Sequence, residues 1–170
     1  LGYTLRIGHN ILEKAMQGNA EVLDYLNFLL AGELSARDQY FIHSSMYQEW
    51  GYGKLYDRIF HEMEDETLHA KSIIARLLML GATPKMVPEK LDIGADVQAM
   101  LESDLRVELQ VRDNLKKGIA LCEKHQDYVT RELLVEQLKD TEEDHAHWLE
   151  KQLFLIKQVG LQNYLQSQAN

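Results

Sequence analysis

Four stretches of this sequence each place a glutamate where the spacing of the neighbouring apolar residues favours a hydrophobic side chain. These glutamates are Glu33, Glu66, Glu108 and Glu142. Two of them precede a histidine by three residues, so that Glu66 is paired with His69 and Glu142 with His145. Residues i and i+3 lie on one face of an α-helix, and each pair therefore presents an oxygen and a nitrogen ligand to one point.

Buried carboxylates of this kind need a compensating charge. An isolated buried carboxylate is strongly unfavourable, and four in one helical core would also repel one another. Cations placed between them would remove both penalties. Two Glu-x-x-His pairs and two single glutamates make up the ligand set of di-iron carboxylate bundles. We therefore predict a two-metal site formed by all six residues.

The spacing of these residues repeats along the chain. Glu66 follows Glu33 by 33 residues, and Glu142 follows Glu108 by 34 residues. Each half therefore has the same plan, which is a single glutamate and then a Glu-x-x-His pair one helical hairpin later. Carboxylate and imidazole ligands suit iron, with manganese and zinc as competitors. A closed structural zinc site would usually contain more cysteine or histidine.

Some neighbours of the six residues have two interpretations. Tyr40 lies two turns beyond Glu33 on the same face. It is either a core aromatic residue or a hydrogen-bond or electron donor to the metals. Glu62, one turn before Glu66, is either an outer ligand or a cavity-lining acid. Asp144 and His147 break the matched spacing, and we interpret both as surface residues.

The elements that must position these residues are long helices. Apolar periodicity predicts four of them and a short amphipathic tail, over residues 20–48, 54–80, 97–124, 128–158 and 161–168. Gly81 is the expected C-cap of the second helix. Pro84 and Pro88 lie in a long connection without helical periodicity. Two short turns and one long crossover predict an all-α, ferritin-like four-helix bundle with a short C-terminal fifth helix.

The composition excludes several classes of protein. The formal net charge of −9 argues against nucleic-acid binding, and no apolar run is long enough to cross a membrane. Cys122 is the single cysteine, which rules out an intrachain disulfide and favours a reducing, cytoplasmic location. Residues 1–15 lie outside the helical plan of residues 16–170. We expect them to be an upstream extension of the reading frame or a cloning artefact, with an ordered tail as the alternative.

The sequence resembles the bacterioferritins and closely related bacterial ferritins from about residue 16 to residue 168. The resemblance rests on segments 32–43, 61–69, 140–145, 148–150 and 160–167. It implies a hollow shell of 24 subunits that oxidises ferrous iron with oxygen or peroxide and stores ferric mineral. By position, the six residues named above are the ferroxidase ligands, and Glu66 and Glu142 bridge the two irons. His61 and Asp65 match an extra iron position on the inner surface of some relatives. Asn163 and Gln166 in the tail helix would lie nearest the fourfold pore.

One position departs from the bacterioferritin pattern. Those proteins bind haem between two subunits through a methionine directly after the second-helix glutamate, and this chain has Thr67 there. A homogeneous cage is therefore expected to lack haem b, because a hydroxyl is a poor ligand for haem iron. Met63 would move the haem by one helical turn, about 5 Å. The family's ferredoxin partner uses the haem, so that partner is uncertain here. A mixed cage with a haem-binding bacterioferritin subunit remains open.

Three other classes compete with a ferroxidase cage. A rubrerythrin-like peroxidase usually carries a cysteine-rich segment, which a single cysteine excludes. A DNA-protecting mini-ferritin builds its site between subunits from a different set of residues. A structural subunit with a vestigial site would not be expected to keep all six ligands.

Overall fold

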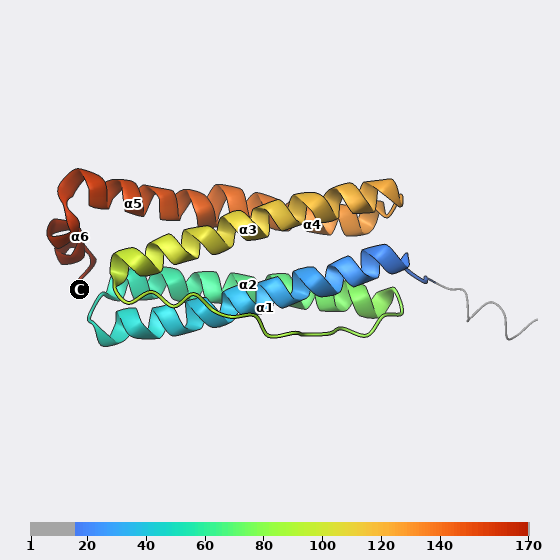
Figure 1. Ribbon diagram of the computed structural model, residues 1–170, viewed down its shortest axis with the longest axis horizontal. Coiled ribbons are helices and arrows are strands. Elements are labelled where there is room, and N and C mark those ends of the chain that lie inside the picture. The colour runs from blue at the N-terminus through green and yellow to red at the C-terminus, as the bar shows by residue number, and fades with distance from the viewer. Residues whose placement is uncertain (1–15, 170) are drawn as a thin grey trace, which may run out of the picture.

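The computed structural model describes residues 16–169, and within that range every regular element is a helix. Figure 1 shows four long rods lying side by side and a short helix across one end. The first three rods are α1 (Ala20–Glu49), α2 (Gly53–Met79) and α3 (Val97–Lys124). The fourth rod consists of α4 (Tyr128–Asp140), η1 (Thr141–Ala146) and α5 (His147–Val159), and the short helix is α6 (Leu161–Gln168). The predicted bundle is confirmed, and the expectation for residues 1–15 lies outside the described residues.

The connections give the bundle its topology. A tight turn around Gly51 joins α1 to α2, and a second turn joins α3 to α4. Between these hairpins, residues 80–96 run the length of the bundle as an extended crossover (Figure 1). Gly81 has a φ of 78° just after α2, as expected for a helix C-terminus. No helix in the described part of the chain is both long and apolar enough to span a membrane.

The helix starts show why these segments are helical. The side chain of Asn19 accepts a hydrogen bond from the Glu21 backbone N–H at 2.9 Å, which caps α1. Asp96 caps α3 in the same way by accepting from the Ala99 N–H at 2.9 Å. These caps fix where α1 and α3 begin, and the apolar stripe of each helix sets which residues face the bundle interior.

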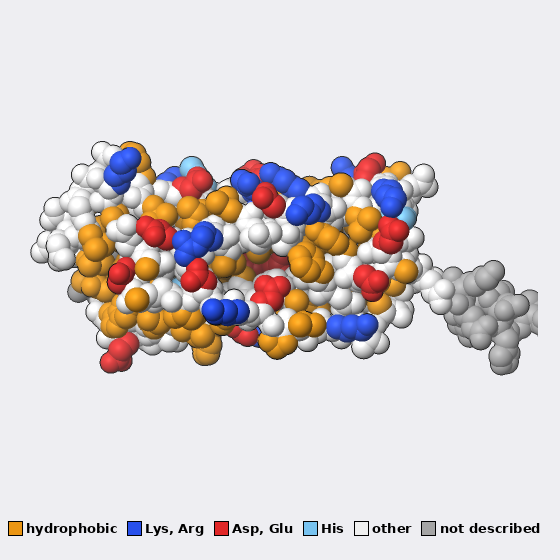
Figure 2. Space-filling model, in the orientation of Figure 1, with side chains coloured by type: hydrophobic (Ala, Val, Ile, Leu, Met, Phe, Trp, Pro, Cys, Tyr) orange, Lys and Arg blue, Asp and Glu red, His pale blue; other side chains and the backbone are white. Residues whose placement is uncertain are grey.

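The core consists of two apolar clusters with a polar layer between them. One cluster includes Leu26, Leu77 and Leu115, and the other includes Tyr47 and Leu55. The buried glutamates and histidines among those singled out above lie between these clusters along the bundle axis. On the face that Figure 2 shows, acidic, basic and apolar side chains are interspersed.

A buried polar network holds the crossover against α1 and α3. The Nδ1 of His43 lies 2.8 Å from Oδ1 of Asp104, and the Gly94 N–H donates to His43 Nε2 at 3.2 Å. Gln39 donates to Asp104 at 2.8 Å and accepts from the Asp92 N–H at 3.0 Å. Every group in this network has a partner, so we interpret it as structural.

The fourth rod differs from the sequence prediction in one respect. We expected an uninterrupted α-helix over residues 128–158, but Thr141–Ala146 form a π-helix. Hydrogen bonds from i to i+5 widen the turn and change which residues share a face. The geometry of the π-helix therefore determines which side chains of the fourth rod reach the polar layer.

Candidate metal centre

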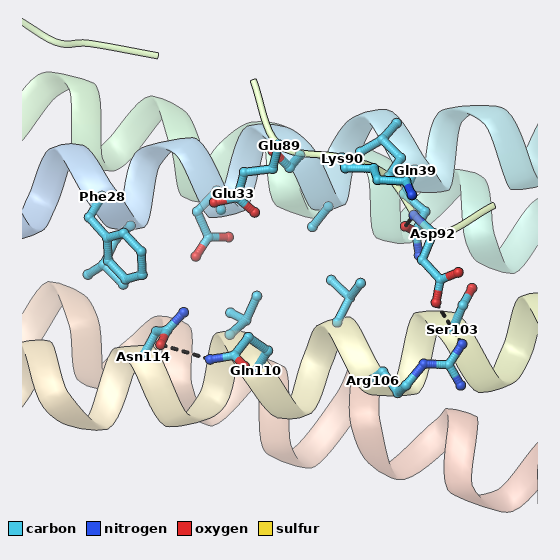
Figure 3. A pocket seen from close by; sticks show the side chains of 17 residues that line it. Phe28, Glu33, Gln39, Glu89, Lys90, Asp92, Ser103, Arg106, Gln110 and Asn114 are labelled. Carbon is cyan, nitrogen blue, oxygen red and sulfur yellow. Dashed lines mark hydrogen bonds and ion pairs between the residues drawn. The ribbon is translucent and has the colours of Figure 1, made fainter. Parts of the chain in front are cut away.

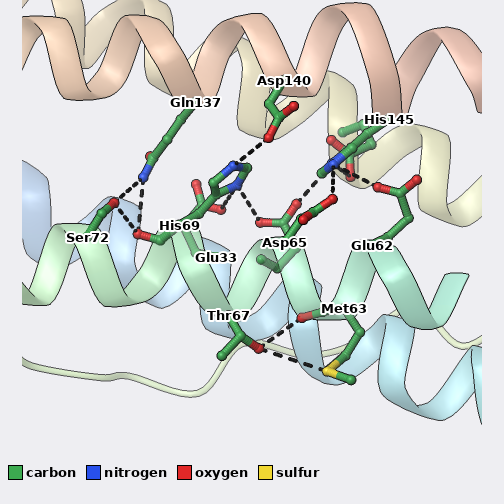
Figure 4. A network of polar contacts seen from close by, with 12 residues as sticks. Glu33, Glu62, Met63, Asp65, Thr67, His69, Ser72, Gln137, Asp140 and His145 are labelled. Atoms are coloured by element: carbon green, nitrogen blue, oxygen red, sulfur yellow. Dashed lines mark hydrogen bonds and ion pairs between the residues drawn. The ribbon is translucent and has the colours of Figure 1, made fainter.

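Five of the six predicted ligands meet in the middle of the bundle, and all five are buried. Glu33 comes from α1, Glu66 and His69 from α2, Glu108 from α3 and His145 from η1. Figure 4 shows the rings of His69 and His145 directed toward the space between the helices. The two ring centroids are 6.0 Å apart.

Glu66 lies between the two histidines. Its Oε2 is 3.3 Å from Nδ1 of His69, and its Oε1 is 3.2 Å from Nδ1 of His145. Glu33 approaches the same nitrogen of His69 at 3.6 Å. Glu108 approaches the same nitrogen of His145 at 3.5 Å. The cluster therefore divides into two halves that share one carboxylate.

Each half could hold one metal ion. Glu33, Glu66 and His69 offer ligand atoms that all lie within 4.8 Å of one another, and so do Glu66, Glu108 and His145. The oxygen and nitrogen donors suit a divalent first-row metal such as Fe²⁺. With one ion in each half, Glu66 would bridge the pair, as the family resemblance implied for Glu66 together with Glu142.

Unpartnered atoms support this fit. Glu33 Oε2, Glu66 Oε1, Glu108 Oε2 and His145 Nδ1 accept or donate no hydrogen bond within residues 16–169, although they are buried. Some have a charged neighbour, but the alignment is not that of a hydrogen bond. Buried polar atoms in folded proteins nearly always have a partner. A metal ion in each half would supply partners for these atoms.

The pKa values in the metal-free cluster show which positive charges the metal ions would replace. Burial and the neighbouring charge of Glu66 raise the pKa of Glu33 well above 4.5. Burial alone would lower the pKa of His69, but the carboxylates of Glu33 and Glu66 raise it to about 11. Burial would likewise lower the pKa of His145, and its carboxylate neighbours raise it. Protonated imidazoles therefore balance the carboxylates when no metal is present.

Glu66 and Glu108 have different charge states in this cluster. Burial acts to raise the pKa of Glu66, but its close contacts with Glu33, His145 and His69 outweigh burial and hold that pKa low. Burial raises the pKa of Glu108 to about 7, despite its contact with His145. The shared carboxylate is thus ionised, as a bridging ligand must be.

Glu142 is the predicted ligand that the structure does not bring to the cluster. Its side chain is 42% exposed, and its Oε1 pairs with Lys116 Nζ of α3 at 2.8 Å. The sequence prediction assumed α-helical geometry, in which Glu142 and His145 would share a face. Both residues lie in the π-helix, where a three-residue separation no longer aligns side chains. The prediction that they share a face is therefore wrong in this structure.

Tyr40 lies at the cluster, as expected from its position two turns beyond Glu33. Its buried hydroxyl donates a short hydrogen bond to Oε1 of Glu108. Burial and the charge of Glu108 raise the pKa of Tyr40 well above 10, so it remains a phenol. The structure thus shows Tyr40 as a hydrogen-bond donor to Glu108, which is a predicted ligand. A role in electron transfer stays a prediction.

A second group of acids lies on the far side of the His145 ring. Glu62 Oε2 is 2.7 Å from His145 Nε2, and Asp65 Oδ2 is 3.6 Å from the same atom. Arg58 pairs with Glu62 and also with Asp144, the latter at 2.8 Å. Glu62 is buried, as its helical phase predicted. Asp144 is 45% exposed but takes part in this group, so interpreting it only as a surface residue was incomplete.

The remaining residues singled out from the sequence lie at the surface. His147 is exposed, as predicted. His61 is more than half exposed, and its Nε2 lies 3.4 Å from Asp65. Asn163 and Gln166 of α6 line a shallow pocket at the end of the bundle. Metal or pore roles for these residues stay predictions.

Sequence reasoning missed Asp140 and Arg58. Asp140 Oδ2 lies 3.1 Å from Nε2 of His69, on the side of the ring that faces away from the cluster (Figure 4). Asp140 belongs to an acidic run and has no histidine at the matched spacing, so nothing in the sequence indicated its contact with His69. Arg58 lies four residues before Glu62 on the same helix, and this i, i+4 spacing could have predicted their ion pair.

Comparison with known proteins places this architecture in a family. The model of the ferritin-like domain of the ferritin family matches residues 23–159. The chain belongs to the ferritin family. A bacterial ferritin of Neisseria meningitidis is 65% identical over 153 residues, which cover 90% of this chain and 99% of that protein. A bacterial ferritin of Pseudomonas aeruginosa is 61% identical over the same shares of the two chains.

This ferritin-family chain is also similar to bacterioferritins. The bacterioferritin of Mycobacterium leprae is 39% identical over 150 residues, which cover 88% of this chain and 94% of that protein. The predicted family resemblance is confirmed. At the expected haem position, Thr67 is exposed and its hydroxyl donates to the Met63 carbonyl oxygen at 2.9 Å. That bond ties Thr67 to its own helix, and the prediction about haem stays a prediction.

Two hollows of this ferritin-family chain reach the cluster. A cavity of about 210 Å³ lies between α1, the crossover and α3, and Glu33 forms part of its wall (Figure 3). Lys90 and Arg106 also line this cavity. A groove of about 630 Å³ between α2 and α4 is lined by His69, Asp140 and Glu143. Glu33 and His69 thus connect the buried cluster to different hollows.

Proposed function

We propose that this chain is an iron-storage subunit with its own ferroxidase centre. Two ferrous ions bind in the two halves of the cluster and share Glu66. Each ion gives up one electron to oxygen or peroxide, and the ferric product is stored as mineral inside an oligomeric cage. The observation that carries this proposal is the division of five buried ligands into two groups with one common carboxylate.

The protein residues have distinct tasks in this reaction. Glu33 and His69 bind one ferrous ion, Glu108 and His145 bind the other, and Glu66 holds the two ions close enough to reduce one oxidant molecule. Tyr40 donates to Glu108 and so orients that carboxylate. The histidines release their Nδ1 protons as the ions enter, because a metal binds the imidazole lone pair. Protons are therefore available near the oxidant, which consumes them when it is reduced.

The family resemblance supports a cage of 24 subunits. Large apolar side chains that stay exposed on the single chain include Phe41, Trp50, Leu78 and Phe154. Exposed apolar side chains of this size are expected at subunit interfaces. A mixed cage is the second candidate, in which a bacterioferritin subunit supplies haem b. This chain has Thr67 in place of the haem-binding methionine, so a second type of subunit would have to supply that methionine.

Ferrous oxidation by purified chains would test the proposed function. The double variant Glu33→Gln with His145→Ala removes one ligand from each half of the cluster. We expect it to lose rapid ferrous oxidation, measured by the rise in ferric absorbance after anaerobically prepared Fe²⁺ is mixed with oxygen. Glu136→Gln changes a carboxylate in the neighbouring groove that lies outside both metal groups and serves as the control. Unchanged oxidation in the double variant would refute the proposal.

A further inference from the structure

The two histidines of the cluster differ in what holds the nitrogen that faces away from it. Both direct Nδ1 toward Glu66. The Nε2 of His69 forms an aligned hydrogen bond of 3.1 Å with Oδ2 of Asp140 (Figure 4). The Nε2 of His145 lies close to Glu62 but has no aligned hydrogen bond among residues 16–169. Asp140 is therefore a specific partner of His69.

This contact determines which nitrogen of His69 is free to bind a metal. A neutral imidazole carries one proton, and the nitrogen without the proton has the lone pair. A carboxylate that accepts from Nε2–H keeps the proton there and leaves the lone pair on Nδ1. Nδ1 is the nitrogen that faces Glu33 and Glu66. We propose that Asp140 is a positioning residue that fixes the tautomer and ring orientation of His69 for metal binding.

Neighbouring contacts hold the end of α4, where Asp140 lies, against α2. Gln137, one turn earlier on α4, donates to the His69 carbonyl oxygen at 3.1 Å and to Ser72 Oγ at 2.8 Å. These bonds join α4 to α2 at the level of His69. The next residue after Asp140 begins the π-helix. The end of α4 is thus fixed relative to the His69 ring before the helix changes its geometry.

The alternative explanation for the contact between Asp140 and His69 is general charge balance in an acidic groove. Its side chain is 47% exposed, and an ion pair at such a site contributes little to stability. Removing Asp140 should therefore leave the fold intact. Glu143 lines the same groove but belongs to neither metal group. Glu143→Ala removes the same charge from that groove without touching the His69 contact, so it separates the two explanations.

The test is cobalt binding by the metal-free assembled protein, followed by the visible absorption of Co²⁺ under anaerobic conditions. This inference rests on the proposed function, which requires two Co²⁺ ions per wild-type subunit. We expect Asp140→Ala to lower the Co²⁺ affinity of one of the two sites by about 10- to 100-fold, as for other carboxylates that support a histidine ligand. Asp140→Asn keeps an oxygen acceptor and should retain most of the affinity. Glu143→Ala should bind both ions like the wild type.

The possible outcomes separate the two proposals. Fewer than two Co²⁺ ions on the wild-type protein would refute the proposed function itself. Two ions on the wild type, with Asp140→Ala equal to Glu143→Ala, would refute only the role of Asp140. Equal losses in Asp140→Ala and Asp140→Asn would also refute it, because the charge and not the hydrogen-bond acceptor would then matter. Circular dichroism and the elution volume of the assembled protein would show that each variant is folded.

Discussion

The carboxylate of Glu142 pairs with Lys116 at 2.8 Å, whereas His145, three residues later, points into the bundle. An α-helix would place both side chains on one face. The π-helix over Thr141–Ala146 separates them. The fourth rod therefore contributes one side chain to the candidate metal cluster in this structure, and the carboxylate that both halves share is Glu66 alone.

Substitution of Glu142 tests this arrangement. We expect Glu142→Gln to bind two Co²⁺ ions per subunit, like the wild type, because its side chain contacts Lys116 and not the cluster. Glu66→Gln should lose at least one of the two ions, since both halves of the cluster use Glu66. The measurement is the stoichiometry of an anaerobic absorption titration. Loss of one ion in Glu142→Gln would restore the sequence-based prediction that this residue is a ligand.

The pKa of Glu108 predicts a pH dependence of the metal-free protein. Burial raises that pKa from 4.5 to about 7. When folding raises the pKa of a carboxyl group, its contribution to stability is fully present at pH values below the pKa in the unfolded chain. That contribution is lost as the pH rises through the pKa in the folded protein. Glu108→Gln cannot ionise, but it still offers an acceptor to Tyr40. Between about pH 4 and about pH 8, the wild type should lose about 3 kcal/mol of unfolding free energy relative to this variant.

Chemical denaturation of both proteins in the presence of a chelator would measure this difference. Because neighbouring charges also titrate, the relevant quantity is the wild-type value minus the Glu108→Gln value at each pH. A difference that stays constant over the whole range would contradict the raised pKa of Glu108.

Metal binding should release protons. His69, with a pKa of about 11, is an imidazolium cation at neutral pH, and the raised pKa of His145 implies the same for that ring. Each proton must leave before the ligand atom can bind a metal, so affinity should rise with pH. At least about two protons, one from each histidine, should be released for each pair of Co²⁺ ions, as measured with an indicator dye in weak buffer near neutral pH.

His69→Ala is the matched control for proton release. It removes one protonated ligand and should lower the number of released protons by about one for each ion pair. An affinity for Co²⁺ that does not change with pH would contradict this account of the metal-free cluster.

The network that holds the crossover should contribute more to stability than a surface ion pair. Asp104→Ala would leave His43 and Gln39 buried without their acceptor. We expect a loss of about 3 kcal/mol in unfolding free energy, as for other buried pairs that lose one member. Asp92→Ala removes only an exposed pair with Arg106 and should cost less than about 1 kcal/mol. Similar losses in the two variants, measured by denaturant unfolding, would refute the proposed role of this network.

Much of the fold was predictable because the four helices have regular apolar spacing and clear ends. The predicted span of residues 97–124 agrees with α3, and the other long helices agree to within a residue or two at each end. The burial of five predicted ligands was also predictable, because a carboxylate or imidazole in an apolar stripe is expected to face the core, although Glu142 does not. For Glu33 and Glu108, helical phase alone was sufficient.

The missed features depend on contacts that periodicity does not encode. A π-helix depends on how the fourth rod packs against α2 and α3, and the spacing of Glu142 and His145 still appeared α-helical. Asp140 belongs to an acidic run in which each carboxylate looks alike in sequence. Only the meeting of α4 with α2 shows that its side chain reaches His69.

The most direct test of the shared carboxylate is the structure of metal-free crystals soaked anaerobically with Fe²⁺, with diffraction recorded at the iron absorption edge. We expect two anomalous peaks per subunit, one on each side of Glu66. One peak should contact Glu33 and His69, and the other should contact Glu108 and His145. A single peak, or two peaks that do not both contact Glu66, would show that Glu66 is not the shared ligand.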